Sequence, residues 1–495
     1  MTKTSGTPSS FYGSFFVSDK RQVFGELLVR GRGSMLTLRD GAEVNMHGPK
    51  LHVRGTSVDG HQITCIDCIH SGEGSSSQGN AYYHYTELFP HFVVVGAEHL
   101  DPDASTVEEL SFSLSDLNEL FYDPDAFGLI GNASPIMDAV LEEKRKRRPI
   151  DVGDCPEVHY YTGKSTALDV DTAIGNLIVR YERSTRFGGT DGIQIKNNRR
   201  IWIKPHQPAS FFDAIDRIVV LRRFFSMAAG RPQKIRSIRI TTISDRTKLK
   251  PLRVNWSFAP KGPRGDHHKP DRINRPFDPI GQPDEFTTSL KNWIDRDGKM
   301  KHARVRHLSC MERRDGYGVD RLVAAANLFD LLPTDAWPPF TVLPDGLSEF
   351  QASAEKALGT IEPSQDRDSV LAAVKRMGKP SLPKKVLHRW ATASKDIPDV
   401  FPELEYVLKQ AVRCRNYFVH GPSSDSFKFE RAEPFVFFLT DALEFVFCFS
   451  DLVEAGWDAK GWAKRPYSYG HTFSRFRWGY DQTLAAFKAS MGQPT

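Results

Sequence analysis

Hydrophobic and polar residues alternate with the period of β-strands along the first hundred residues. Short runs rich in β-branched and aromatic residues are separated by turn signals such as Asp40-Gly41 and Asp59-Gly60. The Gly- and Ser-rich tract 72–79 interrupts this pattern and is typical of a flexible loop. The pattern predicts an antiparallel sandwich or meander, with strands at residues 15–17, 23–29, 35–38, 51–53, 62–66 and 92–95.

Strand patterns return further along, around one amphipathic helix. A run of basic residues at 144–148 is either an anion-binding patch or a solvated helix end. Residues 209–229 follow the helical period and stop at Gly230, and we assign Arg217, Arg222 and Arg223 to the solvent-facing side of this helix. Strands are expected before and after it, at residues 158–161, 173–181, 192–196, 200–203, 234–244 and 252–258.

Beyond about residue 290 the hydrophobic period changes from that of strands to that of helices. The chain is therefore expected to be an α+β protein. A β-rich N-terminal domain, antiparallel sheets with a packed helix, would occupy residues 1–300, with a subdomain break near 140–155. An all-α bundle would occupy residues 301–495. Its helices are expected at residues 319–332, 347–359, 367–377, 383–394, 402–420 and 430–456.

The helix expected at 402–420 carries the densest group of candidate catalytic side chains. Its apolar residues form one stripe, and Gly421-Pro422 is a stop signal. Asn416 and His420 are four residues apart and share a face, whereas Arg415 and His420 are separated by about 140° around the axis. Arg415 therefore needs a curled side chain, a curved helix or a second chain to act beside His420. The plain alternative is a helix end whose cations complement the helix dipole.

Composition and charge limit the cellular compartment and the kinds of binding surface that we expect. The formal net charge is +5, from 66 basic and 61 acidic residues, so any nucleic-acid surface must be local. Six scattered cysteines fit a reducing compartment, and we expect a cytoplasmic protein without a secretory signal. The most apolar run, 435–449, contains Asp441 and Glu444, which favours a buried helix over a membrane span.

Two further groups of residues are weaker candidates for binding. Cys65 and Cys68 have the spacing of half a zinc site, but no second pair follows, and in a regular strand they would point to opposite faces. We interpret them as ordinary thiols. A basic stretch ahead of the helical region is a candidate surface for an RNA backbone, with a solvated connector as the alternative. Its residues are Lys301, Arg304, Arg306, Arg313 and Arg314.

The sequence Arg415-Asn416-Tyr417-Phe418-Val419-His420 closely resembles the motif of HEPN domains, in which an arginine and a polar residue precede a histidine. The helix at 319–332 resembles the opening helix of the Apea-like HEPN group. Residues 13–41 are similar to the N-terminal domain of ApeA-type abortive-infection proteins. The two resemblances follow one another in the order that ApeA-type proteins have.

This resemblance implies an anti-phage endoribonuclease that needs no metal or other cofactor. Such an enzyme cleaves RNA, here tRNA at the anticodon loop, by attack of a 2′-hydroxyl that leaves a 2′,3′-cyclic phosphate. The catalytic residues would be Arg415, Asn416 and His420. Arg413 is the rival of Arg415, because the family spacing tolerates four to six intervening residues.

The resemblance also implies partners. These are RNA, a second copy of the chain bound through the HEPN bundle, with higher assembly allowed, and a phage-derived trigger; no membrane is involved. The alternative is a non-catalytic HEPN module that binds RNA, dimerises or senses a signal.

Overall fold

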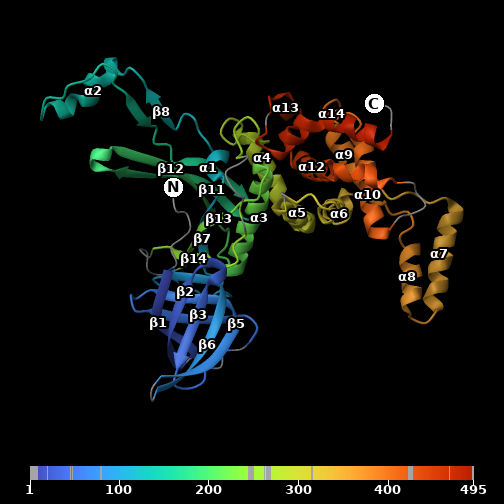
Figure 1. Ribbon diagram of the computed structural model, residues 1–495, viewed down its shortest axis with the longest axis horizontal. Coiled ribbons are helices and arrows are strands. Elements are labelled where there is room, and N and C mark those ends of the chain that lie inside the picture. Colours follow the sequence, from blue (N-terminus) through green and yellow to red (C-terminus); the bar gives the residue numbers. More distant parts are fainter. Residues whose placement is uncertain are drawn as a thin grey trace. The chain divides into compact units, whose positions relative to one another are not determined.

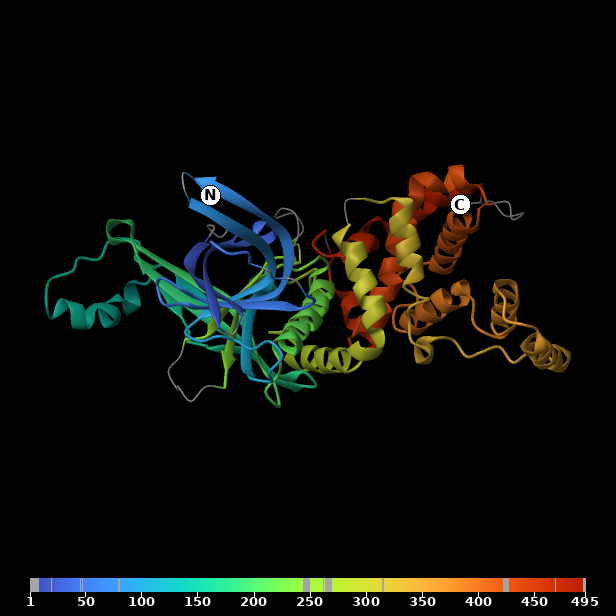
Figure 2. The ribbon, with the colours of Figure 1, turned by 90° about the horizontal axis from the view of Figure 1, so that it is seen from below.

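The computed structural model describes residues 9–492 apart from 19, 45, 47, 79–80, 244–249, 261, 263–268, 314–315, 422–426 and 468. The chain forms two compact units, Met1–Thr287 and Thr288–Thr495. The first is rich in strands and the second is helical (Figure 1; Figure 2). The predicted α+β class is confirmed.

The first unit opens with a closed antiparallel barrel, drawn in blue in Figure 1. Alternate residues of each strand point inward, and Phe15, Leu27, Leu36 and Val53 are fully buried in its core. The strand order is β6-β3-β2-β1-β4-β5, and a further pairing of β5 with β6 closes the ring. The strands are β1 (Ser9–Ser18), β2 (Arg21–Val29), β3 (Met35–Asp40), β4 (Leu51–Ser57), β5 (Gln62–Gln78) and β6 (Ala81–Gly96).

The Gly- and Ser-rich tract that we predicted to be a loop continues strand β5 as far as Gln78, so that prediction is wrong. Its residues pair with the first half of β6. A Cβ atom added to Gly74 would lie only 2.7 Å from the Tyr85 hydroxyl oxygen. The glycine thus makes room for an aromatic side chain of the neighbouring strand and does not mark a flexible segment. Gly79 lies outside the described residues.

Cys65 and Cys68 both point into the barrel core, contrary to the expectation from regular strand geometry. The register shifts between them, and Asp67 has a φ of 53°. Such a bulge inserts one residue into the alternation, so residues three apart come to share a face. A hydrogen bond to Cys68 and burial both raise the pKa of the Cys65 thiol. Over the described ranges no group of three or more His, Cys, Asp or Glu side chains could hold a metal ion.

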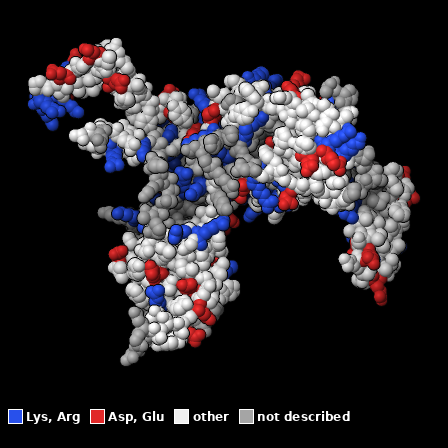
Figure 3. Space-filling model, in the orientation of Figure 1, with Lys and Arg blue, Asp and Glu red and all other residues white. Residues whose placement is uncertain are grey.

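The barrel strand β6 also pairs with β14, which extends the barrel into a broader sheet with the order β6-β14-β13-β7-β12-β11-β10. A separate pair, β8 with β9, carries helix α2, and the basic run 144–148 forms an exposed patch at the end of this arm (Figure 3). The additional elements are β7 (Val107–Leu114), α1 (Leu117–Leu120), β8 (Phe127–Ile130), α2 (Ser134–Arg145), β9 (Val158–Tyr161), β10 (Thr166–Thr172), β11 (Gly175–Phe187), β12 (Ile193–Lys204), β13 (Ile235–Thr242) and β14 (Leu252–Trp256).

Helix α3 (Phe211–Ala229) is the predicted amphipathic helix, but it is buried on more sides than its sequence suggests. Ser210 caps its first turn and Gly230, with a φ of 66°, ends it. Arg222 and Arg223 are only 4% and 3% exposed, so their assignment to the solvent face is wrong. Arg222 donates from Nε to the Gln233 carbonyl at 2.7 Å, a bond that compensates part of the cost of burial.

The second unit is organised around helix α12, which coincides with the most apolar run of the sequence. The two acidic residues of this run both have partners. Glu444 binds Arg321, and Asp441 accepts a hydrogen bond from the Tyr317 hydroxyl. No described helix has the length and apolar character needed to cross a bilayer. Helices α6, α9, α10 and α14 pack against α12. The helices that include residues of this unit are α4 (Pro283–Asp295), α5 (Asp297–Glu312), α6 (Val319–Asn327), α7 (Asp345–Thr360), α8 (Gln365–Val374), α9 (Leu382–Ser394), α10 (Leu404–His420), α11 (Phe429–Ala432), α12 (Val436–Glu454), α13 (Ala459–Lys464) and α14 (Thr472–Met491).

Candidate active site

Helix α10 presents the candidate site at its C-terminal end. Its predicted apolar stripe is buried, with Val407, Leu408 and Ala411 at 0% exposure, which fixes the helix in the bundle. The helix ends at His420, and Gly421 follows with a φ of 79°, a conformation that favours glycine. The buried stripe therefore anchors the helix while its last turn carries polar groups to the surface.

Arg415 brings the candidate residues together. Its Nη1 lies 3.3 Å from His420 Nε2 and donates to Asn416 Oδ1 at 3.0 Å. Its Nη2 donates to the side-chain oxygen of Asn327 at 3.0 Å. The long side chain thus spans the angular gap of about 140° within one chain, and this contact needs no second copy.

Burial differs along this group. Arg415 and Asn416 are half-buried, whereas the His420 side chain is exposed. Arg415 Nε is enclosed and makes no hydrogen bond with any residue that the structure describes. A ligand can therefore reach the imidazole and the outer edge of the guanidinium, but not the Nε edge.

The neighbouring polar residues take different positions from those that helix geometry alone suggests. Asn416 accepts a hydrogen bond from Arg415, and within the described part of the chain none joins it to His420. The Arg413 guanidinium carbon lies 6.0 Å from the centre of the Phe427 ring. Arg415 is thus the arginine that contacts His420.

Sequence reasoning missed Asn327, the last residue of α6. It follows three buried alanines on a helix packed against α10 and α12, and it is itself half-buried. A polar side chain beside the buried face of a helix generally has a hydrogen-bond partner. That position was the available signal, but the identity of the partner depends on the fold.

The basic stretch proposed as an RNA surface lies on α5 and is not uniformly exposed. Arg304 is 1% exposed and binds Asp451 through Nε and Nη2, each at 2.9 Å, so including it in an RNA surface is a wrong prediction. Lys301, Arg306 and Arg313 are exposed. Arg314 lies outside the described residues.

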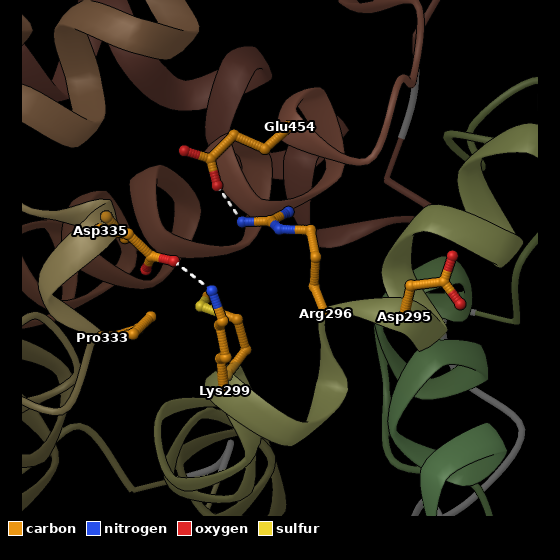
Figure 4. A pocket seen from close by; sticks show the side chains of 8 residues that line it. Asp295, Arg296, Lys299, Pro333, Asp335 and Glu454 are labelled. Atoms are coloured by element: carbon orange, nitrogen blue, oxygen red, sulfur yellow. Dashed lines mark hydrogen bonds and ion pairs between the residues drawn. The ribbon is translucent and has the colours of Figure 1, made fainter. Parts of the chain in front are cut away.

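The helical unit also contains a pocket of about 430 Å³, lined by charged residues (Figure 4). Lys299 pairs with Asp335 at 2.6 Å, and Arg296 pairs with Glu454. Asp295 points away from both pairs (Figure 4). Both cations at this pocket are thus paired with carboxylates, which leaves no cation set aside for an anionic ligand such as phosphate among the described lining residues.

Comparison with family models gives two matches. Residues 10–293 match ApeA N-terminal domain 1, and residues 345–460 match Apea-like HEPN. The HEPN match includes the motif on α10 but begins after α6, so the helix expected to open the bundle and Asn327 lie outside it. Comparisons with curated proteins and with solved structures gave no match. Because the first match alone covers more than half of the chain and the second follows it, the chain belongs to the ApeA family, with an ApeA N-terminal domain followed by an Apea-like HEPN domain.

Proposed function

We propose that the chain is a metal-independent endoribonuclease of antiviral defence that cleaves RNA, with the tRNA anticodon loop as the target, and that Arg415, Asn416 and His420 form its catalytic group. HEPN domains are generally ribonucleases, which supports this activity class. The observation that carries the proposal is the 3.3 Å contact between Arg415 Nη1 and His420 Nε2 at an exposed helix end. It places a fixed positive charge beside a titratable base.

The contact indicates how the reaction starts. Arg415 can donate to Nε2 when the imidazole is neutral and carries its proton on Nδ1, which is the form that a general base needs. An incoming phosphate competes for the guanidinium, because arginine binds phosphate oxygens strongly and in a defined geometry. His420 Nε2 is then free to accept the proton of the ribose 2′-hydroxyl.

The chemical step is an internal transfer. The 2′-oxygen attacks the adjacent phosphorus, the bond from phosphorus to the 5′-oxygen breaks, and that oxygen takes up a proton. The products are a 2′,3′-cyclic phosphate and a 5′-hydroxyl end. Arg415 stabilises the charge that develops on the phosphate oxygens, while Asn416 orients the guanidinium. Single-stranded loops are the preferred targets, because their backbone can adopt the in-line arrangement.

A base and an acid are both needed, and each chain supplies one motif histidine. HEPN domains typically dimerise, and we place the second histidine on a partner copy that packs through the HEPN bundle. In this scheme residues 301–495 cut RNA, while residues 1–300 respond to a phage-derived trigger in the cytoplasm.

Cleavage by purified variants tests the proposal. His420→Ala and Arg415→Ala should each abolish cleavage of total RNA, since one removes the base and the other the phosphate charge. His420 is exposed and Arg415 is half-buried, so both variants should remain folded, which a thermal melt of each variant checks. Unchanged cleavage by both folded variants would refute the proposal. RNA binding without cleavage by the wild-type chain would instead support a non-catalytic HEPN module.

A further inference from the structure

Asn327 contacts the candidate site from a different helix. Its side-chain oxygen accepts a hydrogen bond from Arg415 Nη2 at 3.0 Å, across a separation of 88 residues. It ends α6, whereas Arg415 lies on α10. It also precedes residues 345–460, so the HEPN family match does not include it.

The helix that carries Asn327 is firmly held. Arg321, earlier on α6, binds both carboxylate oxygens of Glu444 on α12, each at 2.8 Å. The Tyr317 ring lies against the same guanidinium, 4.4 Å from its central carbon. Buried Leu322 and Ala325 add apolar contacts from the inner face of the helix. Asn327 is therefore presented from a rigid element, which a positioning group requires.

The hydrogen bonds of Arg415 show what Asn327 fixes. A guanidinium has five N–H donors. The two on Nη1 are directed at Asn416 and His420, and one of the two on Nη2 is directed at Asn327. The Nε donor is enclosed. The Asn327 bond thus sets the rotation of the guanidinium plane, with Nη1 beside the histidine and, among the residues that the structure describes, no partner on the second Nη2 donor.

We propose that Asn327 is a positioning residue that holds the Arg415 guanidinium against the scissile phosphate beside His420. This inference rests on the proposed ribonuclease function. An arginine side chain has several rotatable bonds, so a guanidinium that no other residue holds samples many positions. Asn327 restricts it to the orientation that serves the reaction, and does so without touching the RNA bond that breaks.

Two nearly isosteric variants separate this role from simple packing. Asn327→Leu keeps the shape but removes the acceptor, and should lower kcat for a fluorophore-labelled single-stranded RNA by about tenfold to a hundredfold. Asn327→Asp keeps the acceptor and should retain kcat within about fivefold, while its KM rises because the new carboxylate competes with phosphate for Arg415. A structural role predicts no such split between kcat and KM.

Asn292→Leu is the matched control. Asn292 is an exposed asparagine of the helical unit whose side chain, like that of Asn327, bonds to another segment; it donates to the Ala455 carbonyl at 3.0 Å. Its replacement removes one hydrogen bond of the helical unit but should leave kcat unchanged. Equal losses of kcat in the two leucine variants would overturn the positioning role.

Binding supplies a second test that does not depend on turnover. The probe is a fluorescein-labelled single-stranded RNA with 2′-O-methyl riboses, which cannot cyclise. Asn327→Leu should weaken its binding in the wild-type background and have no further effect in the Arg415→Ala background. Equal weakening in both would overturn the inference.

The two proposals fail differently. If His420→Ala and Arg415→Ala lose cleavage but Asn327→Leu keeps wild-type kcat, only the positioning role is overturned. If all three variants cleave normally, the proposed function falls as well.

Discussion

Replacing Arg304 by methionine should destabilise the helical unit, although sequence analysis placed this arginine on an RNA-binding surface. The Arg304 side chain is fully enclosed, and its central carbon lies 3.7 Å from the centre of the Trp293 ring. It binds Asp451 through two hydrogen bonds of 2.9 Å. Methionine fills a similar space but leaves the buried carboxylate without its main partner.

The magnitude follows from what remains around Asp451. Removing one member of a buried ion pair typically costs about 3–5 kcal/mol. Asp451 keeps the Trp293 indole N–H at 3.0 Å and Arg296 Nη1 at 3.2 Å, so we expect the lower end of that range, about 3 kcal/mol. For a unit of about 200 residues this corresponds to a fall in melting temperature of about 6–12 °C.

The pH dependence has a defined sign. Burial alone would raise the pKa of Asp451, but the charges of Arg304 and Arg296 outweigh it and hold the pKa below its usual value. A lowered pKa contributes stability above the unfolded-state value of about 3.9, and this stability is lost as the pH falls through the folded-state value. The difference between wild type and Arg304→Met should therefore be full at neutral pH and shrink in acid.

Calorimetry of the full-length chain measures the effect, with Arg306→Met as control. Arg306 is exposed on the same helix, and its replacement should change stability by no more than about 0.5 kcal/mol. Adding Asp451→Asn to Arg304→Met should cost less than the sum of the single changes, because the two residues form one pair. An Arg304→Met protein that melts within 2 °C of wild type would refute the reasoning.

Three further predictions concern other parts of the molecule. Arg413→Ala should retain cleavage within about threefold while Arg415→Ala loses at least about a hundredfold, because Arg415 contacts His420; the reverse order in a gel assay would assign the role to Arg413. Gly55→Ala should destabilise the barrel by about 1–3 kcal/mol in urea unfolding, since the new methyl overlaps the buried Phe15 ring, whereas Gly41→Ala has open space and should not. Ellman's reagent should label one thiol rapidly in the native protein and none in Cys155→Ser, because the other five cysteines are buried; a second fast thiol would contradict the packing.

The sequence predicted secondary structure best where the hydrophobic residues keep one period, helical or strand-like, along a whole segment. The apolar stripe of α10 and the run that became α12 predict buried helices directly, because each apolar position meets the same neighbouring face. The barrel strands were located for the same reason. The closure of the barrel could not be predicted, because it depends on β5 and β6 pairing along their full length.

Sequence-based predictions failed at positions where a side chain lies in an environment that is unusual for its residue type. Gly74 makes room for the Tyr85 ring of the neighbouring strand, and Arg222 and Arg223 lie in the interior. Helix α5 escaped prediction because buried Arg304 and His307 break its apolar period. Each of these positions depends on a partner from a different segment, and for Arg304 that partner, Asp451, lies 147 residues away.

In the candidate site, too, some features could be predicted from the sequence and others depend on the fold. The motif on α10 could be recognised in the sequence, since its residues lie within one short segment. The contact between Arg415 and His420 depends on the conformation of a long side chain, and the contact with Asn327 depends on the packing of α6 against α10. Single-sequence reasoning has no access to either.

The central claim is that this HEPN domain cuts RNA by internal transfer with His420 as a proton-transfer group. Analysis of RNA ends after incubation with the purified chain, in the presence of a chelator, tests it most directly. The account predicts new 2′,3′-cyclic phosphate and 5′-hydroxyl ends that are absent with His420→Ala. Cleavage that leaves 3′-hydroxyl and 5′-phosphate ends, or that persists in the His420 variant, would contradict it.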